Sequence, residues 1–267
     1  MGSLFRMSEA LNLHFTTYGD ASRPTLIILH GLLGSSDNWH SIARRLSDHF
    51  HVCTIDARNH GRSPHSEEFD YPVMVNDVVN FMYRQKRATA SLLGHSMGGK
   101  TAAWMALLHP ELIEKLIVVD IAVRSYQAHH DRIFDALTTL NLRILQSRKE
   151  VDQALSDRIP EPHVRQFLLK NLLRDEQGVY RWKMNLDVIE KKYPCILEAV
   201  PSGRVFTKPT LFIRGENSDY IQMEDLPSIA QVFPSAELVT IAGAGHWVHA
   251  DNQDDFITNV ADFLVHS

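Results

Sequence analysis

The octapeptide Gly94-His95-Ser96-Met97-Gly98-Gly99-Lys100-Thr101 fits two sequence patterns that imply different chemistry. Matched to G-x-S-x-G, it predicts a nucleophile elbow, a strained strand-to-helix turn from which Ser96 attacks an acyl carbon. Matched to G-x-x-x-x-G-K-[ST], it predicts a P-loop, in which backbone N–H groups and Lys100 hold the phosphates of a nucleotide. Asp120, which ends the apolar run 116–119, would hold magnesium in the second case. This stretch by itself leaves both reactions open.

Two glycine-rich segments elsewhere in the chain favour the nucleophile elbow. His30-Gly31-Leu32-Leu33-Gly34 follows an apolar run, where such an enzyme needs a loop that turns a backbone N–H toward the reacting oxygen. Ala242-Gly243-Ala244-Gly245-His246-Trp247 supplies a histidine near the end of the chain, where a general base is expected. A P-loop enzyme would leave His30, Gly31 and His246 without a role.

Residue chemistry then assigns the roles. A serine hydroxyl is a weak nucleophile at neutral pH, so Ser96 needs a base, and His246 can take its proton and later protonate the leaving group. The backbone N–H groups of Leu32 and Met97 would donate hydrogen bonds to the tetrahedral oxyanion. The predicted reaction is therefore acyl transfer to Ser96 followed by hydrolysis.

Strand and helix patterns that could position these groups alternate over most of the chain. Short apolar runs predict strands at 11–18, 25–29, 51–56, 89–93, 115–122, 210–213 and 237–241. Helical spacing of apolar residues predicts helices at 38–46, 72–86, 100–109, 223–233 and 254–265. This alternation predicts an α/β fold with a mainly parallel central sheet, helices on both faces, and a ligand site beyond the carboxyl ends of the strands.

The strand signal is absent between residues 124 and 203, where helical patterns occupy 133–145, 151–159, 164–173 and 186–200. We interpret this segment as a helical cap inserted between two parts of the core, 1–123 and 204–267. Tyr180 and Trp182 in the cap, and Trp247 beside His246, are candidates to line an acyl pocket, with core packing as the alternative for all three. Together with Gly31, Leu32 and Met97 they form the predicted substrate-binding set.

Composition excludes several classes of partner. The chain has 267 residues, 44% of them hydrophobic, and a net charge of −5, so it can bury a large core and favours neither nucleic acid nor an anionic membrane as partner. Two cysteines without C-x-x-C spacing suit a reducing compartment. Because no apolar run is long enough to span a membrane and no export signal opens the chain, we expect a soluble cytoplasmic protein.

The motifs together resemble those of the α/β-hydrolase superfamily. The matching segments are His30-Gly31-x-x-Gly34, Asp56-x-Arg58-x-x-Gly61-x-Ser63, Gly94-His95-Ser96-Met97-Gly98 and Gly245-His246, spread over the whole chain. Within the superfamily the chain is most similar to YbfF-type bacterial esterases with a small helical cap, through segments 94–100, 118–122, 214–218 and 243–250. The resemblance implies hydrolysis of esters, with coenzyme A thioesters as a further substrate class, and no cofactor.

Members of this superfamily carry the serine, the acid and the histidine in that order along the chain. Asp120 and Asp219 both lie between Ser96 and His246, so either could be the acid. Most members place the acid in a G-x-x-D turn after the last strand but one, and in Gly215-Glu216-Asn217-Ser218-Asp219 the aspartate comes one residue late. YbfF-type esterases are similar in taking their acid from the position of Asp120, at the end of the strand after the elbow helix. We therefore predict Asp120 as the acid, with Asp219 as the alternative.

The prediction is a cofactor-free serine esterase for small to medium acyl groups, acting on a small-molecule ester or thioester. A P-loop nucleotide hydrolase using residues 94–101, or a non-catalytic ligand-binding member of the same fold, are the alternatives. No metal site is expected, because the chain has no H-E-x-x-H motif or cysteine cluster. The cap segment 124–203 holds 13 Lys and Arg against 11 Asp and Glu, a net charge of +2 over a body of −7, which would suit an anionic handle such as the phosphates of coenzyme A.

Overall fold

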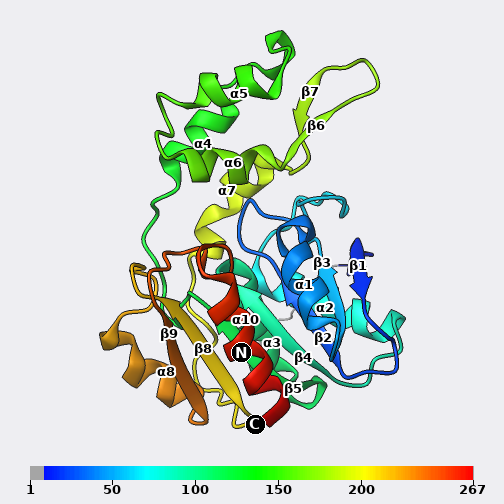
Figure 1. Cartoon of the computed structure of the whole chain (residues 1–267), viewed down its shortest axis with the longest axis vertical. Coiled ribbons are helices and arrows are strands. Elements are labelled where there is room, and N and C mark those ends of the chain that lie inside the picture. The colour runs from blue at the N-terminus through cyan, green and yellow to red at the C-terminus, as the bar shows by residue number, and fades with distance from the viewer. Residues whose placement is uncertain (1–8, 267) are drawn as a thin grey trace, which may run out of the picture.

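The computed structural model describes residues 9–266 and contains a seven-stranded sheet in the order β1-β3-β2-β4-β5-β8-β9. Only β1 runs antiparallel to its neighbour, and the remaining pairs are parallel. The strands are β1 (Phe15–Tyr18), β2 (Thr25–Leu29), β3 (His51–Ile55), β4 (Ala90–His95), β5 (Ile113–Val119), β8 (Thr210–Gly215) and β9 (Ala236–Ile241). The predicted α/β fold is confirmed, with strand positions close to those expected (Figure 1).

Helices cover both faces of this sheet, because its central strands are apolar on both sides. On one face α1 (His40–Leu46) and α10 (Gln253–His266) pack over one hydrophobic core. On the other face α2 (Tyr71–Arg84), α3 (Met97–Leu108) and α8 (Leu226–Val232) pack over a second core. The shorter helical turns are η1 (Ser36–Trp39), η2 (Pro110–Leu112), η4 (Met223–Asp225) and α9 (Val248–Asp251).

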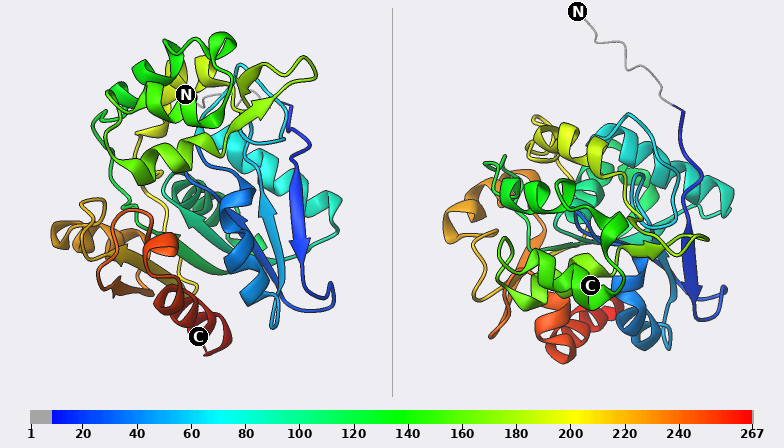
Figure 2. Two further views of the ribbon diagram at one scale, coloured as in Figure 1. Left: turned by 45° about the horizontal axis from the view of Figure 1, so that its top comes forward. Right: turned by 90° about the horizontal axis from the view of Figure 1, so that it is seen from above.

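A cap lies over one end of the sheet and is drawn in green and yellow-green in Figures 1 and 2. Its elements lie inside the predicted segment 124–203. They are α4 (Asp131–Thr138), η3 (Leu142–Ile144), α5 (Arg148–Leu155), α6 (Pro162–Leu169), β6 (Leu172–Arg174), β7 (Tyr180–Trp182) and α7 (Leu186–Ile196). The first eight residues of the predicted core segment 1–123, and residue 267, lie outside the described residues.

The expectation of a purely helical cap is wrong at one place, where β6 and β7 form an antiparallel hairpin. Asp175 Oδ1 accepts hydrogen bonds from the Gln177 and Val179 N–H groups, and Gly178 has a φ of +79°. These contacts build the turn, since an aspartate side chain can replace a backbone acceptor and glycine tolerates positive φ. Strands of three residues are too short to show an alternating pattern, so the sequence carries no clear signal for them.

The cap is joined to the core by a third hydrophobic cluster. Leu33 of the glycine-rich loop and Met97 of the elbow pack in this cluster with buried side chains from α4 to α7. Because burial of apolar area stabilises the contact, the cap is held directly above the two loops that carry the predicted chemistry.

Candidate active site

Ser96 occupies a strained turn between β4 and α3, with φ +53° and ψ −119°. The turn requires glycine on both sides. A Cβ on Gly94 would lie 2.2 Å from the Gly98 carbonyl oxygen, and a Cβ on Gly98 would lie 2.3 Å from that of Leu29. Such close backbone approach, together with the positive φ of a non-glycine residue, is the geometry of a nucleophile elbow. It presents the serine side chain at the crest of the turn.

Of the two predicted oxyanion donors, Met97 follows Ser96 in the chain and Leu32 borders the same cavities as Ser96. Among residues 9–266, neither the Leu32 N–H nor the Met97 N–H has a hydrogen-bond partner, so both donors are free. Leu32 sits in a loop that approaches the elbow closely, because a Cβ on Gly31 would lie 2.8 Å from His95 Nδ1. Free backbone donors beside a nucleophile can stabilise a tetrahedral oxyanion without reorganising during the reaction.

The structure pairs His246 with Asp120 rather than with Asp219. His246 Nδ1 lies 2.7 Å from Asp120 Oδ2, an acceptor-only atom when the carboxyl is ionised, so Nδ1 carries the proton and donates it. Asp120 also accepts hydrogen bonds from the Ser218 hydroxyl and, at 3.1 Å, from the Gly215 N–H. With Nδ1 protonated, Nε2 of His246 is left as the proton acceptor that a general base needs.

Asp219, the alternative acid, has an exposed side chain in the loop after β8. Its Oδ1 accepts a hydrogen bond of 3.2 Å from Gln222 Nε2 within the same loop. The neighbouring Ser218 reaches the triad through its hydrogen bond to Asp120. The G-x-x-D turn of the general pattern therefore supplies a serine that supports the acid, and the acid itself comes from the end of β5.

Burial sets the protonation state of the pair. It lowers the pKa of His246 to about 3, so the imidazole is neutral at pH 7 and can accept a proton. Burial raises the pKa of Asp120, and the hydrogen bonds from Ser218 and Gly215 oppose that rise. Ser96 and His246 border the same cavity without a direct hydrogen bond between their side chains, a contact that commonly tightens only when substrate binds.

Aromatic rings pack around the catalytic histidine and behind it. The ring of Tyr220 stacks on that of His246, with centroids 3.8 Å apart and an interplanar angle of 17°. On another side, His95 Nε2 donates a hydrogen bond of 2.8 Å to the His246 carbonyl oxygen. His249 packs edge-on against His95 at 4.8 Å and stacks on Trp39 at 4.2 Å. This packing limits the orientations open to the His246 ring.

A cavity of about 200 Å³ between the cap and the core opens onto Ser96 and His246. Trp247 lines it, as do the predicted loop residues Gly31 and Leu32. Met97 lines a smaller neighbouring cavity that also borders Ser96. The remaining side chains of the larger cavity are Leu33, His95, His130, Ile133, Val164, Phe167, Leu168 and Tyr220.

The expectation that Tyr180 and Trp182 line this cavity is wrong. Both residues belong to β7 and border a different hollow on the cap, together with residues of η3 and α7. Trp182 Nε1 donates a hydrogen bond of 3.3 Å to the Leu137 carbonyl oxygen, so its indole is part of the cap's own packing. The hairpin turns these rings away from Ser96.

Tyr220, His130 and Phe167 line the cavity, and sequence reasoning missed them. His130 borders the cavity, and its Nδ1 lies 2.5 Å from the Tyr193 hydroxyl. These residues are 34 to 124 positions from Ser96 along the chain, and no motif marks them. Only the placement of the cap brings them to the site.

Lys100, the signature residue of the P-loop pattern, is buried and turned away from the cavity. Its Nζ donates hydrogen bonds to the carbonyl oxygens of Leu197 and Glu198 at the end of α7, and lies 4.7 Å from the centre of the Tyr126 ring. The ammonium therefore joins α3 to the base of the cap. It does not point to a space that could hold a phosphate.

This burial makes a prediction about stability. Desolvation lowers the pKa of Lys100 from 10.5 to about 7, so between these values the unfolded chain binds a proton that the folded chain does not. The contribution of Lys100 to the free energy of unfolding of the wild type therefore increases as the pH rises from 7 to 10.5. Lys100→Met has no group that titrates at this position, so its stability lacks this dependence on pH. Relative to the wild type, the melting temperature of the variant should therefore fall from pH 7 to pH 10. Thermal melts across this range test it, and a constant difference would show that Lys100 is charged when folded.

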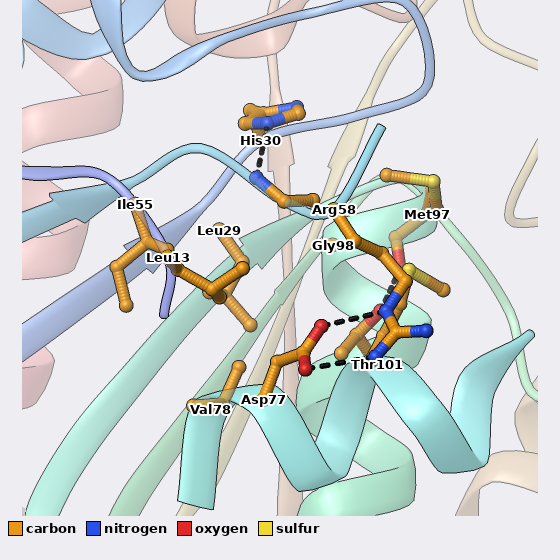
Figure 3. Close-up of a pocket in the computed structure, with 12 residues that line it drawn as sticks. Leu13, Leu29, His30, Ile55, Arg58, Asp77, Val78, Met97, Gly98 and Thr101 are labelled. Carbon is orange, nitrogen blue, oxygen red and sulfur yellow. Dashed lines mark hydrogen bonds and ion pairs between the residues drawn. The ribbon is translucent and has the colours of Figure 1, made fainter. Parts of the chain in front are cut away.

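A third cavity, of about 20 Å³, does not border Ser96 or His246 (Figure 3). Beside it, Arg58 makes a bidentate ion pair with Asp77 at 2.7 and 2.8 Å. His30 Nε2 accepts a hydrogen bond of 3.0 Å from the Ala57 N–H, so His30 is neutral and braces the loop that carries Leu32. These groups position the loop and do not face the reaction.

Comparisons with known proteins agree with this geometry. A family model of the alpha/beta hydrolase fold matches residues 24–253. The chain is 39% identical to the sn-1-specific diacylglycerol lipase ABHD11 of Xenopus tropicalis, over 96% of this chain and 83% of that protein. It is 34% identical to the esterase YbfF of Escherichia coli, over 93% and 96% of the two chains. A solved structure described as a marine microorganism esterase superposes with a TM-score of 0.92 at 45% identity, covering 95% and 100%.

Two further observations bear on ligands and location. None of the helices that the structure describes is long and apolar enough to cross a membrane. Within residues 9–266, no group of three or more His, Cys, Asp or Glu side chains is arranged to hold a metal ion. The described site consists of protein groups that can carry out acyl transfer.

Proposed function

The chain belongs to the α/β-hydrolase family as an esterase- or lipase-type hydrolase, and from this premise we propose that it hydrolyses carboxylic esters of small to medium acyl groups through an acyl-Ser96 intermediate. The observation that carries the proposal is the hydrogen bond from His246 to Asp120, beside a serine in a strained elbow and two free backbone donors. A binding protein would have no need of this combination.

In the proposed reaction, Ser96 Oγ attacks the ester carbonyl carbon while His246 Nε2 accepts the hydroxyl proton. The carbonyl oxygen becomes an oxyanion that accepts hydrogen bonds from the Leu32 and Met97 N–H groups. The tetrahedral intermediate collapses, the bond to the alcohol oxygen breaks, and His246 gives its proton to that oxygen. Water, deprotonated by His246, then attacks the acyl carbon, and Ser96 leaves with the returned proton. Asp120 stabilises the imidazolium in both halves of the reaction.

The proposal is tested by exposing the protein to a fluorophosphonate and locating the adduct by mass spectrometry, alongside p-nitrophenyl esters from acetyl to palmitoyl. We expect a single adduct on Ser96 and turnover that is highest for the shorter chains. Ligand binding without turnover or labelling would point to a non-catalytic member of the family. Thermal stabilisation by ATP, with no labelling, would point to the nucleotide hydrolase.

Acyl-CoA thioesters are the second substrate class that we propose to test. Support comes from the net charge of +2 on the cap segment 124–203. A cationic cap attracts phosphates, and salt screens this attraction. We compare kcat/KM for acetyl-CoA and p-nitrophenyl acetate over a range of salt. Equal and salt-independent values would remove the CoA hypothesis.

A cytoplasmic location, in keeping with two free cysteines, is likewise a proposal.

A further inference from the structure

Ser96 lies between two cavities of very different size. The larger has a volume of about 200 Å³ and the smaller about 30 Å³. Leu32, Ser96, His130 and Tyr220 border both, so the serine can be reached from either side. An ester has two arms, the acyl group and the alcohol, and the two cavities can each hold one of them.

The position of His246 decides which arm enters which cavity. This histidine borders the larger cavity, and it is not among the residues that line the smaller one. In ester hydrolysis His246 must reach the alcohol oxygen to protonate it as the bond to the acyl carbon breaks. The alcohol therefore extends from Ser96 into the larger cavity. The acyl group extends the other way, past Met97, whose N–H is one of the two oxyanion donors.

We propose that the enzyme is selective for esters of short acyl groups, acetyl to butanoyl, with large apolar alcohols. This inference rests on the proposed esterase function and names its substrate class. The longer apolar chain of the substrate then belongs to the leaving group, and the acyl group that Ser96 carries is small.

The walls of the smaller cavity require an acyl group that is apolar as well as short. Four tyrosines line it, and each hydroxyl already has a partner in the protein. The Tyr71 and Tyr126 hydroxyls donate hydrogen bonds of 2.6 Å to the carbonyl oxygens of Ile196 and Tyr220, respectively. The Tyr193 and Tyr220 hydroxyls lie 2.5 Å from ring nitrogens of His130 and His129, respectively. Because the hydroxyls are engaged, the rings present apolar surface, and a polar acyl group would lose hydrogen bonds with water on entry.

The larger cavity suits an alcohol with an extended apolar body. Its outer wall is formed by Val164, Phe167 and Leu168 of α6, and by Trp247 of the histidine loop. Phe167 and Trp247, with ring centroids 5.4 Å apart, also border the next hollow of about 230 Å³.

Two isomeric esters test the assignment in the wild-type enzyme. Octyl acetate and ethyl octanoate have the same atoms and differ only in which arm is long. We expect kcat/KM for octyl acetate to exceed that for ethyl octanoate by roughly tenfold or more, since a misfit of even one methylene changes kcat/KM by about tenfold or more. A preference for ethyl octanoate, or equal rates, overturns the assignment while the esterase function stands. If neither isomer nor p-nitrophenyl acetate is hydrolysed and Ser96 is not labelled, the esterase function itself fails.

Substitutions in the smaller cavity should change the preference for acyl length, and substitutions in the larger cavity should change the preference for alcohol length. Ile196→Ala enlarges the smaller cavity and should raise the rate with p-nitrophenyl hexanoate relative to the acetate, whereas Val164→Ala in the larger cavity should leave that ratio as in the wild type. Phe167→Trp narrows the larger cavity and should lower kcat/KM for octyl acetate more than for ethyl acetate. Because Ile196 is buried, the folding of Ile196→Ala is first checked by circular dichroism. If that variant does not fold, the result with Phe167→Trp tests the assignment. The opposite pattern in either substitution contradicts the assignment.

Discussion

Replacing Ser96 by alanine should lower kcat with p-nitrophenyl acetate by roughly 10⁵-fold or more, the size of loss seen when the nucleophile of a serine hydrolase is removed. The physical reason is that no other hydroxyl stands at the elbow between the two free N–H donors of Leu32 and Met97. The oxyanion donors and the cavity remain in the variant, so a small residual rate above that of water is expected. Steady-state kinetics of the purified variant, with a thermal melt to confirm folding, measure the effect.

Ser202→Ala provides a matched control for this variant. Ser202 is exposed in the segment that returns from the cap to the core, and it does not line the cavity that Ser96 borders. We expect its kinetics and its labelling by a fluorophosphonate to equal those of the wild type. If Ser96→Ala keeps more than about a tenth of the wild-type kcat while it remains folded, then another group is the nucleophile and acyl transfer to Ser96 is not the mechanism.

Asp120→Asn should lower kcat by roughly 10⁴-fold, because an amide in this position can stabilise the wrong tautomer of the histidine. In the structure Asp120 Oδ2 accepts the Nδ1 proton of His246, which leaves Nε2 free to act as base. An asparagine side chain can instead donate to Nδ1, which places the proton on Nε2 and blocks the base. It also leaves the imidazolium without its negative partner. Activity against p-nitrophenyl acetate at pH 7 measures the loss.

Asp219→Asn is the comparison that separates the two candidate acids. Its side chain is exposed and bonded to Gln222, so we expect kcat and KM within about twofold of the wild type, as for other exposed polar positions. The reverse outcome, in which Asp219→Asn is inactive and Asp120→Asn retains activity, would mean that the loop after β8 rearranges to deliver the acid when substrate binds.

Much of the fold could be predicted because its signals are local. The apolar runs of the core strands and the helical spacing between them follow from backbone geometry, and six of the seven strands of the main sheet begin within two residues of the predicted start. The hairpin β6–β7 was missed because strands of three residues carry too few side chains to show a period. The resemblance to the α/β-hydrolase superfamily and to YbfF-type esterases is confirmed by the comparisons.

The cavity could not be predicted in the same way. Trp247 was placed near the site because it adjoins His246 in the chain, and the structure puts it in the cavity wall. Tyr180 and Trp182 were equally compatible with an acyl pocket and with core packing, and the hairpin carries them to another hollow. Tyr220 gave no signal, although its ring stacks on His246. Which aromatic ring faces a cavity depends on how the cap is turned, and composition does not encode that.

By itself, the sequence determined that a serine sits in a glycine-flanked turn between a strand and a helix, with a glycine-rich loop before it and a histidine after the last strand. Glycine is needed at Gly94 and Gly98 because any other side chain would clash with the neighbouring backbone. Such a constraint involves only a few adjacent residues, so a short sequence motif reveals it. Two results depended on the tertiary structure. The hydrogen bond that separates Asp120 from the alternative acid Asp219 joins residues 126 positions apart. The unequal cavities on the two sides of Ser96 arise where the cap meets the core, because their shape is the sum of packing between distant segments.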